Sequence, residues 1–269
     1  MVIPDVSVFT AIVDSYLPEP QATLLNGIVF GQSIKVQFEL YDIVKRTGLL
    51  HLVVLSGMNI TILSVLILKA TARFSRVISF MILTIFIAIF VVIVHPQAPI
   101  IRAVIMCYLT LVAFVFQRSI QPIVALFVSA ITIGIIWPQW ITSLSFLLSF
   151  FSTLGILLFV TRIKKSDAVS SQIAHLALTD LKTSISAQIM TVPLIILYFR
   201  QISLIAPIAT LLVGPFIGPL MLLTFAMVIV GSVNWYLGLP FGLICYGITT
   251  GVLIIIELLS KIPFIFITF

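Results

Sequence analysis

The sequence predicts an all-α, polytopic integral membrane helical bundle. Of its 269 residues, 61% are hydrophobic and 8% are charged, whereas soluble domains carry roughly 25% charged residues. Mean hydropathy is +1.32. Apolar runs long enough to cross a bilayer core of roughly 30 Å recur along the chain. Backbone groups in lipid must pair within their own segment, so these runs are expected to be helices, and they lack the alternation of barrel strands.

The segment before the first span is predicted to lie outside the bilayer core. Residues 1–19 contain prolines and acidic residues typical of an exposed lead-in. Residues 20–32 are apolar but short, which favours an interfacial or re-entrant helix over a spanning one. Residues 34–47 mix apolar and charged side chains, as a helix at the membrane surface does. The expected organisation is an exposed and interfacial region, residues 1–47, followed by a transmembrane channel domain, residues 48–269.

About eight transmembrane helices are predicted, with a polar break at 162–182 after the fifth. The seventh span is rich in glycine and proline. Such interruptions are tolerated at membrane depth where protein or water satisfies the freed backbone groups, and in transporters they mark the pathway. A packing kink is the other interpretation. This predicted broken helix carries Pro207, Gly214, Pro215, Gly218 and Pro219. The predicted spans are 49–69, 76–95, 98–117, 120–136, 141–161, 183–200, 203–230 and 234–260.

The distribution of lysine and arginine predicts the orientation. Eight of these residues fall on one face if the spans alternate, and the opposite loops between spans carry little beyond Arg200. The positive-inside rule makes the basic face cytoplasmic in a multi-pass protein of the cytoplasmic (inner) membrane. The amphipathic segment and the C-terminus are then outside. The eight residues are Lys69, Arg73, Arg76, Arg118, Arg162, Lys164, Lys165 and Lys182.

Lys45 and Arg46 run against this rule, because they flank the first span on its outer side. A basic pair at that place suits an anionic ligand, and it equally suits contact with phospholipid headgroups. Both interpretations stay open at the level of sequence.

Polar side chains inside the predicted spans are the informative residues, because they are costly in lipid. His51 lies near the outer end of the first span. Ser56 and Asn59 are three residues apart and share a helix face, and Gly57 permits a close helix approach. No acidic residue stands in this stretch to orient a serine–histidine pair, so catalysis is not expected. We expect His51, Ser56 and Asn59 to shape one polar cavity together with Arg102, on the third span.

Three further polar residues lie in spans. Arg102 is about one and a half turns inside its helix, where it can extend to the outer face or face a polar cavity. Gln188 stands among serine and threonine residues that can bond their own helix backbone, and it is grouped with the cavity. Glu257, in the last span, is expected to be protonated, paired or near the end of a shorter helix.

Neither a metal site nor a cofactor is expected. The two cysteines, Cys107 and Cys245, both lie in apolar runs, without the paired Cys/His spacing of a metal site. No phosphate-cradling nucleotide motif occurs, so energy for transport would have to come from a partner.

The N-terminal motifs resemble the competence domain of the ComEC family. Two runs carry this similarity, LPEPQATLLNGIVFGQ and VKRTGLLHLVVLSGMNITIL. They supply Pro18, Glu19 and Ala22, then Arg46, Thr47, Gly48, His51, Leu52, Ser56 and Gly57. Downstream elements follow in the family's order and cover nearly the whole chain. They comprise Arg102, Ala103 and Met106; Ser145, Leu148, Ser149, Phe150, Thr153, Leu154 and Gly155; Ser186, Ala187, Gln188 and Pro193; and Ser203, Ala206, Pro207 and Pro215.

Two positions depart from the family pattern. Asn59 stands where the family usually has a second histidine, and Thr210 where it has an asparagine. Full-length relatives also carry an oligonucleotide-binding-like domain and often a metallo-β-lactamase-like domain. The chain is therefore expected to correspond to the channel core alone.

The resemblance implies an inner-membrane channel that passes single-stranded DNA into the cytoplasm during natural transformation, with no enzymatic activity of its own. Implied partners are the DNA, membrane lipids, separate extracellular DNA-binding or nuclease components and a cytoplasmic energy-supplying partner. Self-association into a homo-oligomer is left open. A small-molecule or lipid transporter and a non-transporting membrane scaffold are the alternatives, and DNA uptake assays separate them from the channel.

Overall fold

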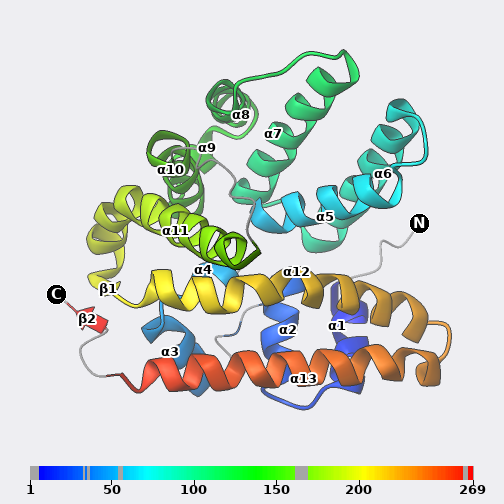
Figure 1. Cartoon of the computed structure of the whole chain (residues 1–269), viewed down its shortest axis with the longest axis vertical. Helices are drawn as coiled ribbons and strands as arrows, with labels where there is room; N and C mark the ends of the chain where they lie inside the picture. Colours follow the sequence, from blue (N-terminus) through cyan, green and yellow to red (C-terminus); the bar gives the residue numbers. More distant parts are fainter. Residues whose placement is uncertain are drawn as a thin grey trace. The chain divides into compact units, whose positions relative to one another are not determined.

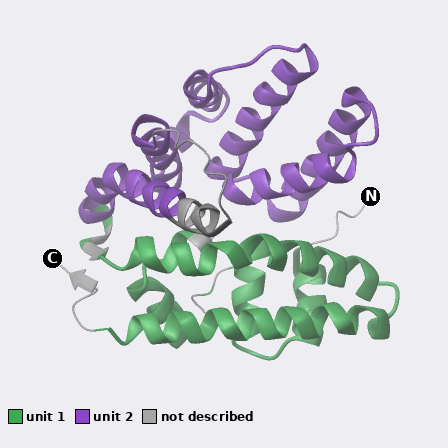
Figure 2. Cartoon of the chain, in the orientation of Figure 1, with its two compact units in different colours: residues 1–55, 198–269 green, residues 56–197 purple. Residues whose placement is uncertain are grey.

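The computed structural model describes residues 6–32, 34, 37–53, 57–160, 169–262 and 266–268. The chain divides into two compact units (Figure 2). Unit 1 joins residues 1–55 to residues 198–269, and unit 2 comprises residues 56–197. The predicted functional division at residue 47 is a different boundary, and it stays a prediction.

Unit 1 is built around a hairpin of two long helices, α12 and α13, against which α1 and α2 pack (Figure 1). A two-stranded antiparallel ribbon pairs Gln201 with Thr268 and Ser203 with Phe266. The elements of this unit are α1 (Val6–Tyr16), α2 (Gln21–Phe30), α3 (Phe38–Arg46), α4 (Leu50–Val53), β1 (Gln201–Ser203), α12 (Ala206–Gly231), α13 (Trp235–Ser260) and β2 (Phe266–Thr268).

The short helix α2 lies in the interior of unit 1. Nine of its ten residues are buried, and it contacts α1, α4, α12 and α13. Burial on all sides differs from a helix lying on the membrane surface with one face exposed, and the depth of residues 20–32 in the membrane stays a prediction. A short helix covered by protein on all sides remains compatible with the re-entrant alternative, because neighbouring helices shield its ends from lipid.

Tyr16, at the end of α1, joins the lead-in to the α12–α13 hairpin. Its ring stacks on Trp235 with centroids 5.6 Å apart, and its hydroxyl donates to the Trp235 carbonyl at 2.8 Å. Three glycines form the socket for the ring. A Cβ on Gly231 would lie 2.7 Å from the tyrosine hydroxyl, one on Gly242 would lie 3.1 Å from its Cβ, and one on Gly238 would overlap it. The lead-in is therefore integrated into unit 1 rather than exposed along its whole length.

Helix α12 is continuous from Ala206 to Gly231, although Pro215 and Pro219 lie inside it. The predicted break is thus wrong as a description of the backbone. Both prolines are exposed, whereas Val213, Ile217 and Leu220 are buried on the opposite side. Pro207 stands in the first turn, where the missing N–H costs nothing. Packing of the buried face keeps the helix whole despite the lost backbone bonds.

The described residues of unit 2 form seven helices, and α7 is central among them. It contacts α5, α6, α8 and α10. The Tyr108 hydroxyl lies 3.4 Å from the Thr84 carbonyl of α6, and Cys107 lies 3.3 Å from the Ser64 hydroxyl of α5. The helices are α5 (Gly57–Ala70), α6 (Arg76–Val94), α7 (Ala98–Val115), α8 (Pro122–Ile136), α9 (Pro138–Ile141), α10 (Leu144–Phe159) and α11 (Val169–Phe199).

Several helix starts carry the capping residue that their sequences provide. The Ser75 hydroxyl accepts from the Ile78 amide ahead of α6, and the Ser143 hydroxyl accepts from the Phe146 amide ahead of α10. Before α13, Asn234 Oδ1 accepts from the Tyr236 amide at 2.9 Å. Each cap satisfies an amide that the first helical turn leaves without a partner.

Five helices of the described chain are long and apolar enough to cross a membrane, namely α6, α7, α12, α13 and the 178–198 part of α11. They correspond to five of the predicted spans. The other three predicted spans correspond to shorter helices, α5, α8 and α10, of 14, 15 and 16 residues. Length and composition make this a membrane protein, with helices of unequal length.

One predicted boundary is wrong, and another lies outside the described residues. The first span was predicted over 49–69; its described parts are α4, up to Val53, and α5, from Gly57, and residues 54–56 lie outside the described part of the chain. Helix α11 begins at Val169, so it occupies part of the predicted polar break and includes Lys182. The residues at 161–168, with Arg162, Lys164 and Lys165 among them, lie outside the described part of the chain.

Candidate functional site

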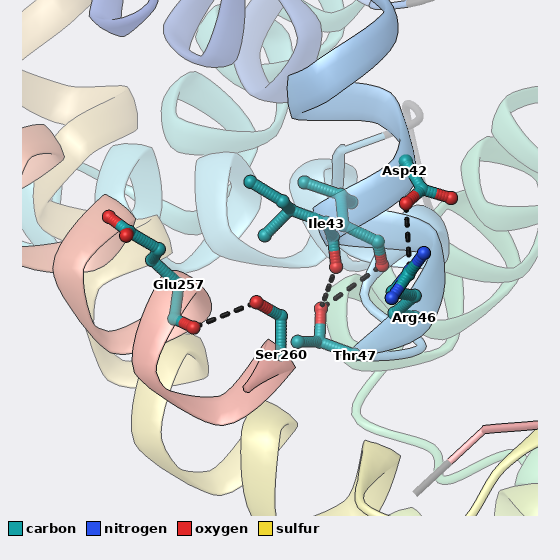
Figure 3. Close-up of polar contacts among 7 residues, drawn as sticks. Asp42, Ile43, Arg46, Thr47, Glu257 and Ser260 are labelled. Carbon is teal, nitrogen blue, oxygen red and sulfur yellow. Dashed lines mark hydrogen bonds and ion pairs between the residues drawn. The ribbon is translucent and has the colours of Figure 1, made fainter. Parts of the chain in front are cut away.

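The C-terminal end of α3 carries the predicted DNA-receiving pair. Arg46 Nε lies 2.7 Å from Asp42 Oδ2, one helix turn earlier, and the two side chains are 54% and 38% exposed. The buried Thr47 hydroxyl donates to the Ile43 carbonyl at 3.0 Å and so closes the helix end (Figure 3). Arg46 is thus an exposed cation with an intrahelical counter-ion. Such surface pairs are worth roughly 0–1 kcal/mol, so this pair holds the arginine only weakly.

The turn after Arg46 fastens α3 to the start of α12. Gly48 has φ +74°, and a Cβ there would lie 2.5 Å from that of Ala206. The Ser203 hydroxyl donates to the Arg46 carbonyl at 2.7 Å. His51 Nδ1 lies 2.9 Å from the Gly48 carbonyl. The Arg-Thr-Gly-x-x-His run therefore has a structural role, because it holds a tight turn against a neighbouring segment.

The end of α13 lies beside α3 in unit 1 (Figure 3). Glu257 Oε1 lies 2.7 Å from Lys261 Nζ, and both side chains are more than half exposed. This settles the three alternatives for Glu257, which is paired and lies near a helix end. The β1–β2 ribbon joins the segment before α12 to residues 266–268. The amphipathic helix and the C-terminal strand thus approach the same segment, and which side of the membrane they occupy stays a prediction.

In unit 2, Arg102 of α7 is buried, with 5% of its surface exposed. Its Nε and Nη2 donate to the Ser149 hydroxyl of α10 at 3.0 and 2.8 Å, and its Nη1 lies 3.1 Å from the sulfur of Met106. Among the described residues, no carboxylate pairs with this guanidinium. The side chain therefore does not extend to the surface. Its positive charge is held between two helices by neutral groups.

The first residue of α5 lies beside this guanidinium. A Cβ on Gly57 would be 3.0 Å from the Ala103 Cβ and 3.4 Å from Arg102 Nη2. Helices α5 and α7 are neighbours, and Gly57 permits their close approach, as predicted. The structure thus brings the helix that carries Gly57 and Asn59 and the Arg102 helix together within unit 2.

The other predicted cavity residues are distributed over both units. Asn59 is buried on the first turn of α5, and Gln188 is half-buried on α11. His51 lies on α4 of unit 1, and Ser56 lies outside the described residues. A single cavity containing all of them stays a prediction.

Comparison with known proteins supplies a family. The sequence model of a family described as "Competence protein" matches residues 28–269. This chain belongs to the competence protein family. An uncharacterised protein of Aquifex aeolicus is 27% identical over 195 residues, which is 72% of this chain and 43% of that protein. The ComE operon protein 3 of Bacillus subtilis is 22% identical over 205 residues, 76% of this chain and 26% of that protein.

The chain therefore spans less than half the length of these two curated relatives. No solved structure matches it significantly. Family membership extends across both compact units, so the arrangement of buried polar groups described above belongs to a competence domain.

Two residues of the chain had not been predicted as functional or structural centres. Ser149 holds Arg102, and the only sequence signal for it was its place in the competence-family pattern. Tyr16 joins α1 to a segment 219 residues away. Such a long-range contact leaves no local pattern, although the glycines that receive the ring were visible in the sequence.

Proposed function

We propose that this chain forms the membrane path by which single-stranded DNA crosses the cytoplasmic membrane during natural transformation. The observation that carries the proposal is the competence-family match over residues 28–269. Membership in that family supports a role in DNA uptake, and helices apolar enough to span a bilayer supply the setting. The single strand as cargo and the inward direction are the proposed part.

The charge distribution suits a conduit that must release its cargo. Single strands bind through cationic grooves and aromatic stacking, but a strongly basic channel would retain them, because conduction requires binding that is also weak enough to leave. The exposed ion pairs at Arg46 and Lys261 have their own carboxylates. Phosphates arriving there would exchange one partner for another rather than bind irreversibly.

Partners follow from what the proposed reaction needs. A separate extracellular component would bind duplex DNA and deliver one strand, and a cytoplasmic partner would supply energy. The chain itself is proposed to act without a cofactor and without catalysing a reaction. Contact with membrane lipids is inherent in the fold, and self-association stays open.

Deletion of the gene tests the proposal directly. Transformation frequency is measured together with the amount of labelled DNA that is bound outside the cytoplasmic membrane. We expect transformation to be lost while external DNA binding persists. Normal transformation in the deletion strain would refute the proposal, and loss of external binding would move the role to an earlier step.

Replacing both Lys45 and Arg46 with Gln tests the receiving pair. Fewer cations at the end of α3 would release fewer counter-ions, so uptake should weaken and its salt dependence should flatten. The matched control is Lys182→Gln, which removes an exposed cation of α11 in unit 2. Unchanged uptake and an unchanged salt response in the double variant would leave only the lipid-headgroup interpretation of the pair.

A further inference from the structure

The C-terminal end of α7, in unit 2, carries a cleft that the proposed function does not use. Its volume is about 560 Å³, and small-molecule sites measure roughly 300–1,000 Å³. The walls come from the last turns of α7 and from the segment that follows this helix. The apolar part of the lining comprises Leu109, Val112, Ala113, Phe116 and Ile120.

The backbone after α7 folds back on the helix and places a cation beside this cleft. Gln117 has a left-handed φ of 56°. The Gln117 amide donates to the Phe114 carbonyl at 3.1 Å, and the Arg118 amide donates to the Ala113 carbonyl at 2.8 Å. These are the two hydrogen bonds of a Schellman motif, which ends a helix in a tight turn. The polar part of the lining, Arg118 and Ser119, therefore lies just beyond the last helical turn.

A second cation meets the same turn of α7. The guanidinium carbon of Arg76, the first residue of α6, lies 4.6 Å from the centroid of the Phe114 ring. Arg76 and Arg118 are both exposed, and the ion pairs found in the described part of the chain involve neither of them. The sequence has no acidic residue between Asp42 and Asp167. An anion in the cleft would thus meet positive charge that no acidic side chain of this stretch offsets.

The two parts of the cleft follow the order of depth in a membrane. Helices α6 and α7 are neighbours, and both are long and apolar enough to cross a bilayer. The start of α6 and the end of α7 then lie where two spans leave the hydrocarbon core. The apolar lining belongs mainly to the helix, and Arg118 stands in the turn beyond it. A phospholipid has the same order, with acyl chains in the core and a charged phosphate in the headgroup layer.

We infer that this cleft binds an anionic phospholipid, whose phosphate contacts Arg118 and whose acyl chain lies along the end of α7. Arginine binds phosphate through paired N–H groups, and basic pockets beside transmembrane helices bind anionic headgroups. A zwitterionic headgroup would bring its own cation toward the two arginines. A single strand of DNA would need a longer cationic groove, whereas most of this lining is apolar. The inference rests on α6 and α7 crossing the bilayer and goes beyond the proposed function.

The test uses the full chain, purified in a neutral detergent, with native mass spectrometry as the measure of affinity for the first bound lipid. The probes are phosphatidylglycerol, which is anionic, and phosphatidylcholine with the same acyl chains. We expect phosphatidylglycerol to bind more tightly. Arg118→Gln should weaken its binding about tenfold, the effect of losing one charge-assisted hydrogen bond, and the preference for the anionic lipid should disappear.

The matched control is Arg73→Gln, which removes an exposed arginine between α5 and α6 that does not line the cleft. This variant should keep the preference for phosphatidylglycerol. If the basic residues attract anionic lipid only through their summed charge, Arg73→Gln and Arg118→Gln will weaken binding equally. That result would overturn the site.

A second variant tests the apolar part of the cleft without changing any charge. Ala113→Leu puts a larger side chain into the lining, so it should weaken the binding of both lipids. Thermal unfolding shows whether each variant is folded, and Ala113→Leu keeps the test decisive if Arg118→Gln is not. Wild-type affinity for phosphatidylglycerol in folded Ala113→Leu would overturn the site.

Two competitors separate the lipid from other phosphates. Inorganic phosphate and a single-stranded oligothymidylate should each displace phosphatidylglycerol only weakly. Binding of either competitor that depends on Arg118, together with equal affinity for the two lipids, would assign the cleft to a free anion or to DNA and overturn the lipid site. Transformation frequency is measured separately, so failure of the lipid site would leave the proposed function untouched.

Discussion

Each unit has a side chain that bonds across its helices, a tyrosine in unit 1 and an arginine in unit 2. Both side chains make long-range hydrogen bonds, Tyr16 to the Trp235 carbonyl and Arg102 to the Ser149 hydroxyl. The tyrosine fills a socket of glycines and brings no charge. The arginine brings a charge that no described carboxylate neutralises. The difference teaches that unit 1 is joined by packing of an uncharged ring, whereas unit 2 buries a charged side chain among neutral hydrogen-bond partners.

The amides buried in unit 1 agree with this distinction. Asn26 Nδ2 donates to Asp14 Oδ1 at 2.8 Å, and Gln21 Nε2 donates to the Thr250 hydroxyl at 3.2 Å. Within the described chain, Asn26 Oδ1 and Gln21 Oε1 have no partner. A neutral acceptor left unpaired costs roughly 1–3 kcal/mol. Burying a charge among neutral partners costs more than burying a neutral amide, because hydrogen bonds to neutral groups do not compensate the charge.

The largest expected effect is Gly238→Ala in the tyrosine socket. The new methyl group would overlap the Tyr16 hydroxyl and approach the Gly231 backbone to 2.9 Å. Overpacking of this kind lowers the free energy of unfolding by about 1–3 kcal/mol. The matched control is Gly247→Ala on the same helix, where nothing lies within 4 Å. Thermal unfolding in detergent measures both, and equal stability of the two variants would show that unit 1 is not held by the socket.

Arg102→Met tests whether the buried arginine stabilises unit 2 in the way that Tyr16 stabilises unit 1. Replacing a buried ionic group by an apolar side chain of similar size is often neutral or stabilising by roughly 1–4 kcal/mol. We expect the variant to unfold at the same temperature as the wild type or above it, while DNA uptake falls. A variant that unfolds earlier would show that Arg102 is a structural clamp, like Tyr16, and the contrast between the units would disappear.

The smallest effect concerns Asp14, on the short helix α1. Burial raises the pKa of its carboxyl, the Asn26 hydrogen bond lowers it, and nearby Glu19 raises it. With a pKa above its ordinary value, native Asp14 binds more protons than unfolded Asp14 in the window between the two values. Stability therefore falls as pH rises through that window, and Asp14→Asn should remove this slope.

Asn26→Leu provides the matched variant, because it deletes the bond that lowers the Asp14 pKa. Its unfolding temperature should fall more steeply with pH than that of the wild type. The measurement is thermal unfolding across the acidic range. A slope that persists in Asp14→Asn would assign the pH dependence to another group.

The helical class and many segment positions could be predicted because they follow from composition and from runs of apolar residues. The neighbourhood of Gly57 and Arg102 also followed from the sequence, since small residues mark close helix approach. The continuity of α12 did not follow. Proline content predicts a break, but the buried face of Val213, Ile217 and Leu220 outweighs two missing backbone bonds.

The burial of α2 was unpredictable for a related reason. A ten-residue apolar segment looks the same whether lipid, water interface or protein surrounds it. Only the contacts with α1, α12 and α13 decide the matter. Ser149 was equally hidden, because one serine among several on α10 gives no sign of which one meets the arginine.

The two prolines inside α12 also have a mechanical consequence. Each removes the donor to the carbonyl four residues earlier, so the carbonyls of Leu211 and Pro215 have no helical hydrogen bond. The two missing hydrogen bonds lie one turn apart and therefore on one side of the helix. The helix is then easier to bend in the direction of that side than in the direction of the buried face. Pro215 and Pro219 thus set the direction in which α12 bends most easily.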